Sequence, residues 1–175
     1  MDDGRTADAW VREALARHEA PLLHYATRLL LGDRERARDA VQETFARLCR
    51  QDPAEVTARL AEWLFTVCRR VALDIRRKEA RMAPLSESLA EAQRSRAPSP
   101  PDSLERRETS AQVQRALAAL SETQQEVLRL KFQNGFSYKE IARVTGLSVS
   151  HVGVQIHLGL KRVRERLGVA ASPPA

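Results

Sequence analysis

The stretch SYKEIARVTGLSVSHVGVQI, residues 137–156, decides the fold of the C-terminal part of this 175-residue chain. Ser137 followed by Glu140 forms a capping box, in which each side chain accepts a hydrogen bond from the other residue's backbone N–H. Gly146 can take a positive φ in a turn, and Ser148 is a good N-cap for the helix that follows. The pattern therefore predicts two helices joined by a three-residue turn.

The short turn and the small residue Ala142, over which the second helix can cross closely, are typical of a helix-turn-helix. We expect the inner side of the second helix to pack through Leu147, Val149, Val152, Ile156, Val163 and Leu167. In such a motif the opposite face enters the DNA major groove, with its first turns nearest the bases. A generic three- or four-helix bundle with a glycine in one turn is the alternative interpretation. At 100° per residue, and with the N-cap included, the predicted DNA-facing residues are Ser148, Ser150, His151, Val154, Gln155, Leu158, Lys161 and Arg162.

Helix-forming residues dominate the composition, and seven glycines are too few for an all-β protein with many turns. Apolar residues recur at helical spacing upstream, as at Ala37, Val41, Phe45 and Leu48. The proline and serine residues at 97–103 cannot sustain a helix and predict an extended linker. The sequence therefore predicts an all-α protein: two small helical bundles joined by a flexible linker, with the helix-turn-helix in the second bundle.

The predicted boundaries follow from these start and stop signals. We expect an N-terminal domain at 7–80, a linker at 81–110 in which a helix begins near 104, a C-terminal domain at 111–168 and a tail at 169–175. In the N-terminal domain, helices are expected at 7–31, with a bend at Pro21, at 34–50 and at 59–80. Further along the chain, helices are expected at 104–119, from the capping box at Ser121 to Asn134-Gly135, from Ser137 to Thr145, and from Ser148 to about Leu167.

Charge is unevenly distributed along the chain, whose formal net charge is +6. Residues 1–68 hold ten basic and twelve acidic side chains, whereas 69–81 hold six and two, and 111–175 hold nine and four. Two separate basic segments indicate a polyanionic partner contacted at two places, although solvated basic faces would give the same counts.

The first basic segment lies on the third predicted helix. Arg69 and Arg76 are seven residues apart on one side, Arg70 and Arg77 lie beside them, and Lys78 follows. Such a row can neutralise phosphates along a strand. Trp63 and Phe65, just upstream, are candidates for stacking on bases of an opened strand. The alternative places Trp63 at the edge of the core and leaves the arginines in solvent.

Other classes of protein find little support in the sequence. Cys49 and Cys68 have no metal-ligand spacing with each other or with the histidines, so we expect two buried thiols, no metal site and no cofactor. No glycine-rich phosphate loop or catalytic constellation suggests an enzyme. No uncharged stretch approaches the roughly 18 residues of a membrane span, so a cytoplasmic location without membrane contact is expected.

Three runs resemble the extracytoplasmic-function (ECF) sigma factors of bacterial RNA polymerase. DAVQETFARL at 39–48 looks like the helix of their conserved region two, and WLFTVCRRVALD at 63–74 resembles the helix that follows it. The stretch 117–167 is similar to their region four. The resemblance covers about residues 10–80 and 112–168, with the linker where the family has one.

The resemblance implies a subunit that directs promoter recognition and transcription initiation. Its implied partners are core RNA polymerase and promoter DNA, and an anti-sigma protein is a further candidate partner. The polymerase would be contacted at its clamp coiled coil and its β-flap. The segment 51–62 would capture a flipped base of the −10 element, and the helix-turn-helix would read the −35 element. The implied −10 residues are Trp63, Arg69, Arg70, Arg76, Arg77 and Lys78, and the implied polymerase-binding residues are Asp39, Gln42, Glu43, Phe45 and Arg47.

Two departures from the family pattern stand out. Arg70 lies where the family usually has asparagine, so discrimination at the −10 element can differ. In the recognition helix, a usual Lys-Ser-Arg run and a further arginine are replaced by Gly153, Val154, Gln155 and Leu158. We therefore hypothesise a weak or unusual −35 reader that contacts thymine methyl groups or docks a protein. The alternative function is a helical adaptor or regulator that binds polymerase or another protein without directing promoter recognition.

Overall fold

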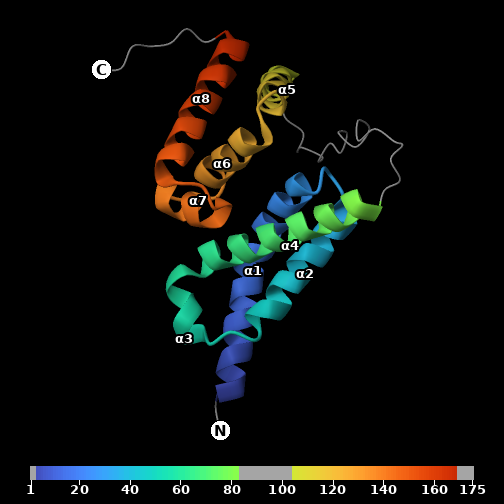
Figure 1. The fold of residues 1–175 in the computed structure, drawn as a ribbon, viewed down its shortest axis with the longest axis vertical. Coiled ribbons are helices and arrows are strands. Elements are labelled where there is room, and N and C mark those ends of the chain that lie inside the picture. The colour runs from blue at the N-terminus through green and yellow to red at the C-terminus, as the bar shows by residue number, and fades with distance from the viewer. Residues whose placement is uncertain (1–2, 83–103, 169–175) are drawn as a thin grey trace. The chain divides into compact units, whose positions relative to one another are not determined.

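The computed structural model describes residues 3–82 and 104–168, with side chains described at 9–82 and 111–168. The described residues form eight α-helices and one short 3-10 helix, without a strand, so the prediction of an all-α protein is confirmed (Figure 1). The chain divides into two units, Met1–Arg96 and Ala97–Ala175. The predicted Pro/Ser linker at 97–103 and the tail at 169–175 lie outside the described residues.

Three long helices build the first unit: α1 (Asp3–Leu29), α2 (Arg34–Leu48) and α4 (Leu60–Met82). Figure 1 shows α2 and α4 running beside α1. Their apolar stripes meet in one core, where the rings of Tyr25 and Phe65 lie 5.1 Å apart between centroids. The side chains that are completely enclosed there are Leu22, Thr44, Leu48, Leu64, Phe65 and Cys68.

The first helix begins four residues earlier and ends two residues earlier than the sequence predicts. Pro21 lies inside α1 and does not end it. The helix ends instead before Leu31 and Gly32, which take φ values of +56° and +99°. A left-handed backbone cannot continue a right-handed helix, so this pair turns the chain into α2.

Polar contacts tie the ends of these helices together. Arg36, near the start of α2, pairs with Glu79 near the end of α4. Arg76 of α4 donates from Nη1 to the carbonyl oxygen of Leu29 at 3.3 Å, and so satisfies an acceptor that the end of α1 leaves open. The C-terminal part of α4 is thereby fixed to both neighbours.

Two short elements between α2 and α4 were not predicted: α3 (Pro53–Val56) and the 3-10 helix η1 (Thr57–Arg59). The expected helices at 34–50 and 59–80 left residues 51–58 between them without a predicted helix. The Asp52 carboxylate accepts from the backbone N–H of Ala54 at 2.9 Å, which makes Asp52 the N-cap of a new helix. Proline at the first helical position has a favourable φ and lacks an N–H that would remain unpaired there.

The second unit contains α5 (Leu104–Ala118), α6 (Glu122–Phe132), α7 (Tyr138–Thr145) and α8 (Val149–Leu167). Both predicted capping boxes are present, at Ser121 and at Ser137. Gly146 has a φ of +77° at the end of α7, and the Ser148 hydroxyl accepts from the backbone N–H of His151 at 3.1 Å. The two helices and their three-residue turn therefore form as predicted.

The core of the second unit is closed by α8. Ile141 and Val152 are completely buried where α7 meets α8. Further along α8, a Cβ atom placed on Gly159 would lie 3.0 Å from Leu128 Cδ1, so glycine permits a close approach of α6. The expected packing of Val149 is wrong, because this side chain at the first position of α8 remains 44% exposed.

The two cysteines differ in their surroundings. Cys68 is buried as expected, whereas Cys49 follows the last residue of α2 and is exposed, so the prediction of two buried thiols is wrong for Cys49. Burial raises the pKa of the Cys68 thiol to about 12, and a side-chain hydrogen bond with Thr44 acts in the opposite direction as the smaller effect. Thiolate formation at Cys68 is therefore suppressed at neutral pH.

Exchanging each of two glycines for alanine should change stability in opposite directions. Gly146→Ala forces a Cβ into left-handed backbone and should lower the free energy of unfolding of the second unit by about 1 kcal/mol. Gly153→Ala should raise it by roughly 0.5–1 kcal/mol, because Gly153 lies inside α8 and its added Cβ would be 3.6 Å from Tyr138 Cε2, an ordinary contact. Hydrogen exchange of the α6–α8 amides measures the free energy of unfolding of each variant. A change of that free energy in the same direction for both variants would contradict this account.

Alkylation should distinguish the two thiols. In the native protein at pH 8.5, iodoacetamide should modify Cys49 while Cys68 reacts at least about a hundredfold more slowly, because its thiolate is scarce and enclosed. Mass spectrometry should detect one added group before unfolding and two after it. The variant Cys49→Ser should take up none in the native state, and rapid labelling of that variant would show that Cys68 is accessible.

Candidate nucleic-acid interface

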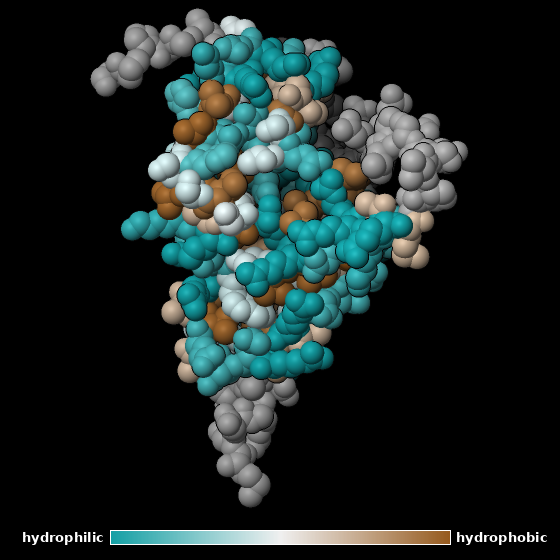
Figure 2. Space-filling view, in the orientation of Figure 1, coloured by the Kyte–Doolittle hydropathy of each residue, from teal (hydrophilic) through white to brown (hydrophobic). Residues whose placement is uncertain are grey.

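The outer face of α8 is a mixed polar and apolar surface. Of the residues predicted to face DNA, Ser148, Ser150, His151 and Lys161 are exposed and polar. Val154 and Leu158, one turn apart, are 52% and 40% exposed. Figure 2 shows apolar residues at the surface of the unit that contains α7 and α8. Exposed valine and leucine on a helix can contact thymine methyl groups or a protein surface.

Two predicted members lie at the flank of this face. Gln155 is half-buried, and its amide nitrogen lies 2.9 Å from Nε2 of His151. Arg162 donates from Nη1 to Oε1 of Gln124 at 3.0 Å, so its guanidinium is directed toward α6. The side chain of Arg162 therefore belongs in part to the packing of α8 on α6.

His157 was missed by the sequence prediction, although the structure leaves it exposed. At 100° per residue it lies about 40° from Lys161 around the helix, well within the outer face. The helical spacing that places Lys161 on the outer face also places His157 there.

Helix α7 brings an aromatic ring and further charge close to α8. The Tyr138 ring lies against Gly153, and the Lys131 ammonium lies 5.4 Å from the centre of the same ring. Lys139 is exposed on α7. Hydrogen bonds from the Ser137 side chain and backbone lower the pKa of Glu140. Its carboxylate is then charged at neutral pH, which keeps the capping box at the start of α7 closed.

The arginines of α4 separate into two groups. Arg70 and Arg77 are exposed, and with the half-buried Trp63 they recur every seven residues, so they differ by only about 20° per step around the helix. Arg69 and Arg76 are half-buried, and Arg76 bonds the carbonyl of Leu29. The predicted DNA contact of Arg69 and Arg76 therefore stays a prediction, and Arg76 has in addition a structural role at the end of α1. Lys78 is exposed beside the outer row.

Arg70, Arg77 and Lys78 are exposed basic side chains of α4, and we call these three residues the α4 basic row. Their positive charge favours contact with a polyanion. Arg77 pairs with Asp74 at 3.2 Å, and their side chains are 67% and 60% exposed. A pair so exposed contributes little free energy, so it can exchange readily for a phosphate.

Phe65 does not fit the stacking role that was predicted for it. The ring is 2% exposed and packs against Tyr25 in the core. It faces the core because α4 turns this flank toward α1, whereas Trp63 lies on the opposite, outer flank. Trp63 alone of the two has an exposed edge.

The segment 51–62, predicted to be a loop that captures a base, is largely helical. It contains α3 and η1 and runs into the first turn of α4. Glu62 is 7% exposed and belongs to the interior. The surface that remains for a ligand in this segment is formed by short helical turns rather than by an open loop.

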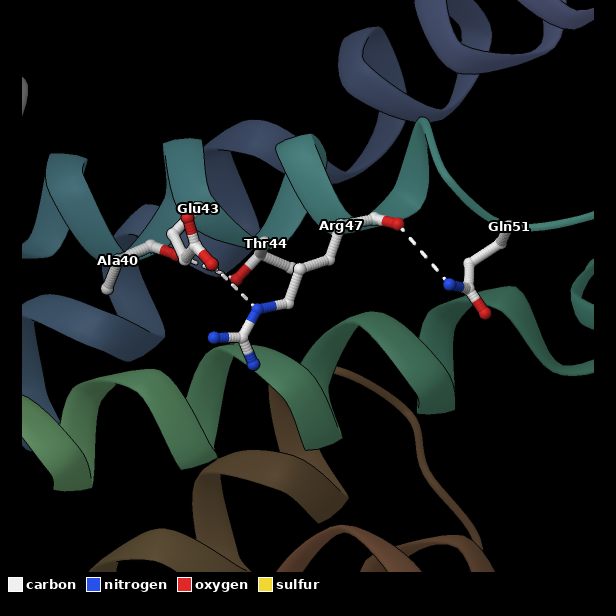
Figure 3. Close-up of polar contacts among 5 residues, drawn as sticks. All are labelled: Ala40, Glu43, Thr44, Arg47 and Gln51. Atoms are coloured by element: carbon white, nitrogen blue, oxygen red, sulfur yellow. Dashed lines mark hydrogen bonds and ion pairs between the residues drawn. The ribbon is translucent and has the colours of Figure 1, made fainter.

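Helix α2 presents an exposed polar face, with Asp39, Gln42, Glu43 and Arg47 on its surface. Figure 3 shows Arg47 Nε bonded to Glu43 Oε1, at 2.8 Å, and the Gln51 amide reaching the Arg47 carbonyl oxygen at 3.5 Å. Phe45, predicted to belong to this surface, is 7% exposed and packs in the core, so that assignment is wrong.

The buried side of α2 is polar at one position. The Thr44 hydroxyl donates to the Ala40 carbonyl oxygen at 2.7 Å, which satisfies this hydroxyl inside the core (Figure 3). Residues 37, 40, 41, 44, 45 and 48 thus form the packing stripe. The two faces of α2 are cleanly divided, and Asp39, Gln42, Glu43 and Arg47 lie on the outer one.

Two searches of the described residues returned no candidates. Within 3–82 and 104–168 no helix has the length and apolarity needed to cross a membrane. In the same residues there is no group of three or more His, Cys, Asp and Glu side chains arranged to hold a metal ion.

Comparison with known proteins identifies the family. Residues 15–82 match the model of Sigma-70 region 2, and residues 110–163 match Sigma-70 region 4. The ECF RNA polymerase sigma factor SigL of Mycobacterium tuberculosis is 33% identical over 169 residues, which cover 92% of each chain. EcfG of Rhodopseudomonas palustris is 32% identical over 140 residues, which cover 79% of this chain and 72% of EcfG.

A solved structure shares the fold. The sigma factor RpoE of Bartonella quintana, crystallised with the anti-sigma factor NepR, matches with a TM-score of 0.70 and 24% identity, over 98% of this chain and 100% of that one. The structural match, the two region models and the identity to SigL agree. The chain belongs to the family of ECF RNA polymerase sigma factors, the subunits that direct transcription initiation.

Proposed function

We propose that this sigma factor divides its work among three surfaces: α2 binds core RNA polymerase, α4 holds the opened −10 strand, and α8 reads the −35 duplex. The observation that carries the proposal is the separation of faces on these helices. Each helix packs through one apolar stripe and leaves a chemically distinct set of side chains outside. We further propose the two domains at 7–80 and 111–168, joined by the linker 81–110.

The α4 basic row, with Trp63 at its start, supports the role at the −10 element. Arg70 and Arg77 are seven residues apart, so they span about 10 Å along the helix axis. Their exposed guanidinium groups can follow the backbone of a single strand, while a base stacks on the half-buried Trp63 ring. Arg69 is a candidate for the same surface, whereas Arg76 acts mainly by holding α4 to α1.

The face of α8 supports an unusual −35 reader. Its first three turns expose or half-expose the polar residues Ser150, His151, Gln155 and His157 and the apolar residues Val149, Val154 and Leu158, and they lack lysine and arginine. Phosphate contacts supply most of the sequence-independent affinity for DNA, so this affinity should be low. The proposed role of Val154 and Leu158 is contact with thymine methyl groups.

The polymerase contacts are proposed for α2 and for the second unit. The acidic residues Asp39 and Glu43, with Gln42 and Arg47, form the surface assigned to the clamp coiled coil, and the second unit is assigned to the β-flap. An anti-sigma protein is a further proposed partner, since the related RpoE was crystallised with one. We also propose that the protein acts in the cytoplasm, where its polymerase is found, as a non-enzymatic subunit.

One observation favours a second candidate function, that of an adaptor which binds polymerase or a regulator without directing starts. Val149, Val154 and Leu158 are each at least 40% exposed on α8. Such side chains are more typical of a protein contact than of a phosphate contact. The experiments below separate the two functions.

Removing the outer arginines should weaken promoter opening in a salt-dependent way. Holoenzyme assembled with core polymerase should produce specific run-off transcripts. At subsaturating holoenzyme, Arg70→Ala with Arg77→Ala should reduce them most, relative to wild type, at low salt, where phosphate contacts contribute most to affinity. Binding of holoenzyme to a melted −10 probe should lose about 1.4 from the slope of log affinity against log salt, about 0.7 for each lost phosphate contact.

The matched control removes two exposed arginines from α2 of the same unit, Arg34→Ala with Arg38→Ala, which have no proposed DNA contact. It should keep the wild-type salt slope. Equal slopes for both double variants would refute the −10 assignment. Tight polymerase binding without any specific start would favour the adaptor.

Replacing thymine by uracil in the −35 duplex should test the apolar face. If Val154 contacts a thymine methyl, uracil at that position should weaken holoenzyme binding about fourfold, the value of roughly one buried methyl group. Val154→Ala should weaken holoenzyme binding by the same factor. In that variant, replacing thymine by uracil should cause no further loss of affinity. Lys161→Ala should instead weaken binding to all sequences alike. Binding of uracil-substituted promoters with unchanged affinity at every position would contradict the contact.

A further inference from the structure

His151 and Gln155 form a pair on one flank of α8. The Gln155 Nε2 atom lies 2.9 Å from Nε2 of the His151 ring, one helical turn away. An amide nitrogen only donates hydrogen bonds, so in this arrangement the ring nitrogen is the acceptor, as the Nδ1-protonated tautomer allows. The contact holds the amide in one orientation.

The histidine is itself held in place from the start of the helix. The Ser148 hydroxyl accepts from the backbone N–H of His151 at 3.1 Å, which pins the first turn of α8. The turn before it is fixed by the left-handed Gly146. A continuous series of contacts therefore runs from the turn through His151 to Gln155.

The contact with His151 uses one of the two amide N–H groups of Gln155. The second N–H and the carbonyl oxygen remain available for another partner. Adenine presents in the major groove an acceptor, N7, beside a donor, the N6 amino group, and a glutamine amide matches this pair with two hydrogen bonds. Guanine offers two acceptors at the same edge and cannot satisfy the glutamine oxygen.

We infer that Gln155 is a base-reading residue that selects adenine within the −35 duplex, and that His151 is a positioning residue that holds the Gln155 amide in the orientation adenine requires. The inference rests on the proposed role of α8 at the −35 element. It adds to that role the selection of adenine, which the apolar pair Val154 and Leu158 does not provide.

Pre-organisation gives His151 its effect. A free glutamine side chain loses rotamer freedom when it is ordered, and this loss weakens binding. The bond to His151 removes part of that cost before DNA arrives. This saving matters in a helix whose first three turns contain no lysine or arginine to supply affinity through phosphates.

The test uses holoenzyme and a promoter set in which each −35 position is changed to every other base pair. Wild-type protein should prefer adenine at one position by roughly tenfold, as a bidentate contact allows. At that position, 7-deazaadenine, which lacks the N7 acceptor, should weaken binding of the wild type. Gln155→Ala should lose the preference and should bind the two adenine forms equally.

The histidine is tested by three variants. His151→Ala should reduce the preference to about threefold or less, because the ordering of the Gln155 amide is lost. His151→Asn restores an acceptor one turn from Gln155 and should recover most of the preference. Arg164→Ala removes an exposed side chain of α8 that is not among the proposed DNA contacts, and it should keep the preference.

Each failure has a separate meaning. If no −35 position shows any base dependence, the proposed reading of the −35 element by α8 fails together with the inference. If base dependence exists but Gln155→Ala leaves it intact, α8 still reads DNA and the assignment of adenine to Gln155 is overturned. If Gln155→Ala abolishes the preference and His151→Ala does not, the positioning role is overturned alone.

Discussion

The turn from Gly146 to Ser148 is the constraint on which the DNA-directed surface depends. Left-handed backbone at Gly146 ends α7, and the Ser148 cap starts α8 three residues later. With so short a connection, the two helices can bury Ile141 against Val152 in only a narrow range of crossing angles. The direction in which α8 presents its outer side chains is thus set by a few backbone dihedrals.

Local signals in the sequence predicted the parts of the fold that local physics controls. The capping boxes at Ser121 and Ser137 form as expected, because their hydrogen bonds lie within one turn of helix. Errors arose where a neighbouring helix decides the outcome. Helical periodicity placed Phe45 in the apolar stripe, and its assignment to the polymerase surface came only from the family resemblance; the structure shows Phe45 covered. Periodicity alone also could not show that Arg76 meets the end of α1.

The two proposed DNA contacts use different physical chemistry. The α4 basic row acts through charge, so its strength depends on ionic strength and little on base sequence. The flank of α8 acts through hydrogen-bond pattern and shape, which depend on base sequence and little on salt. A sigma factor built in this way would derive affinity mainly from polymerase and the opened strand, and selectivity from the duplex.

Gly159 has a consequence beyond the packing it permits. The helix axis of α8 lies near α6 because no side chain separates them at this position, where even a Cβ would be 3.0 Å from Leu128. Any larger residue would displace α8 outward relative to the rest of its unit. Position 159 therefore determines how far the helix protrudes, and sequence change there could alter groove penetration without altering a single DNA-contacting side chain.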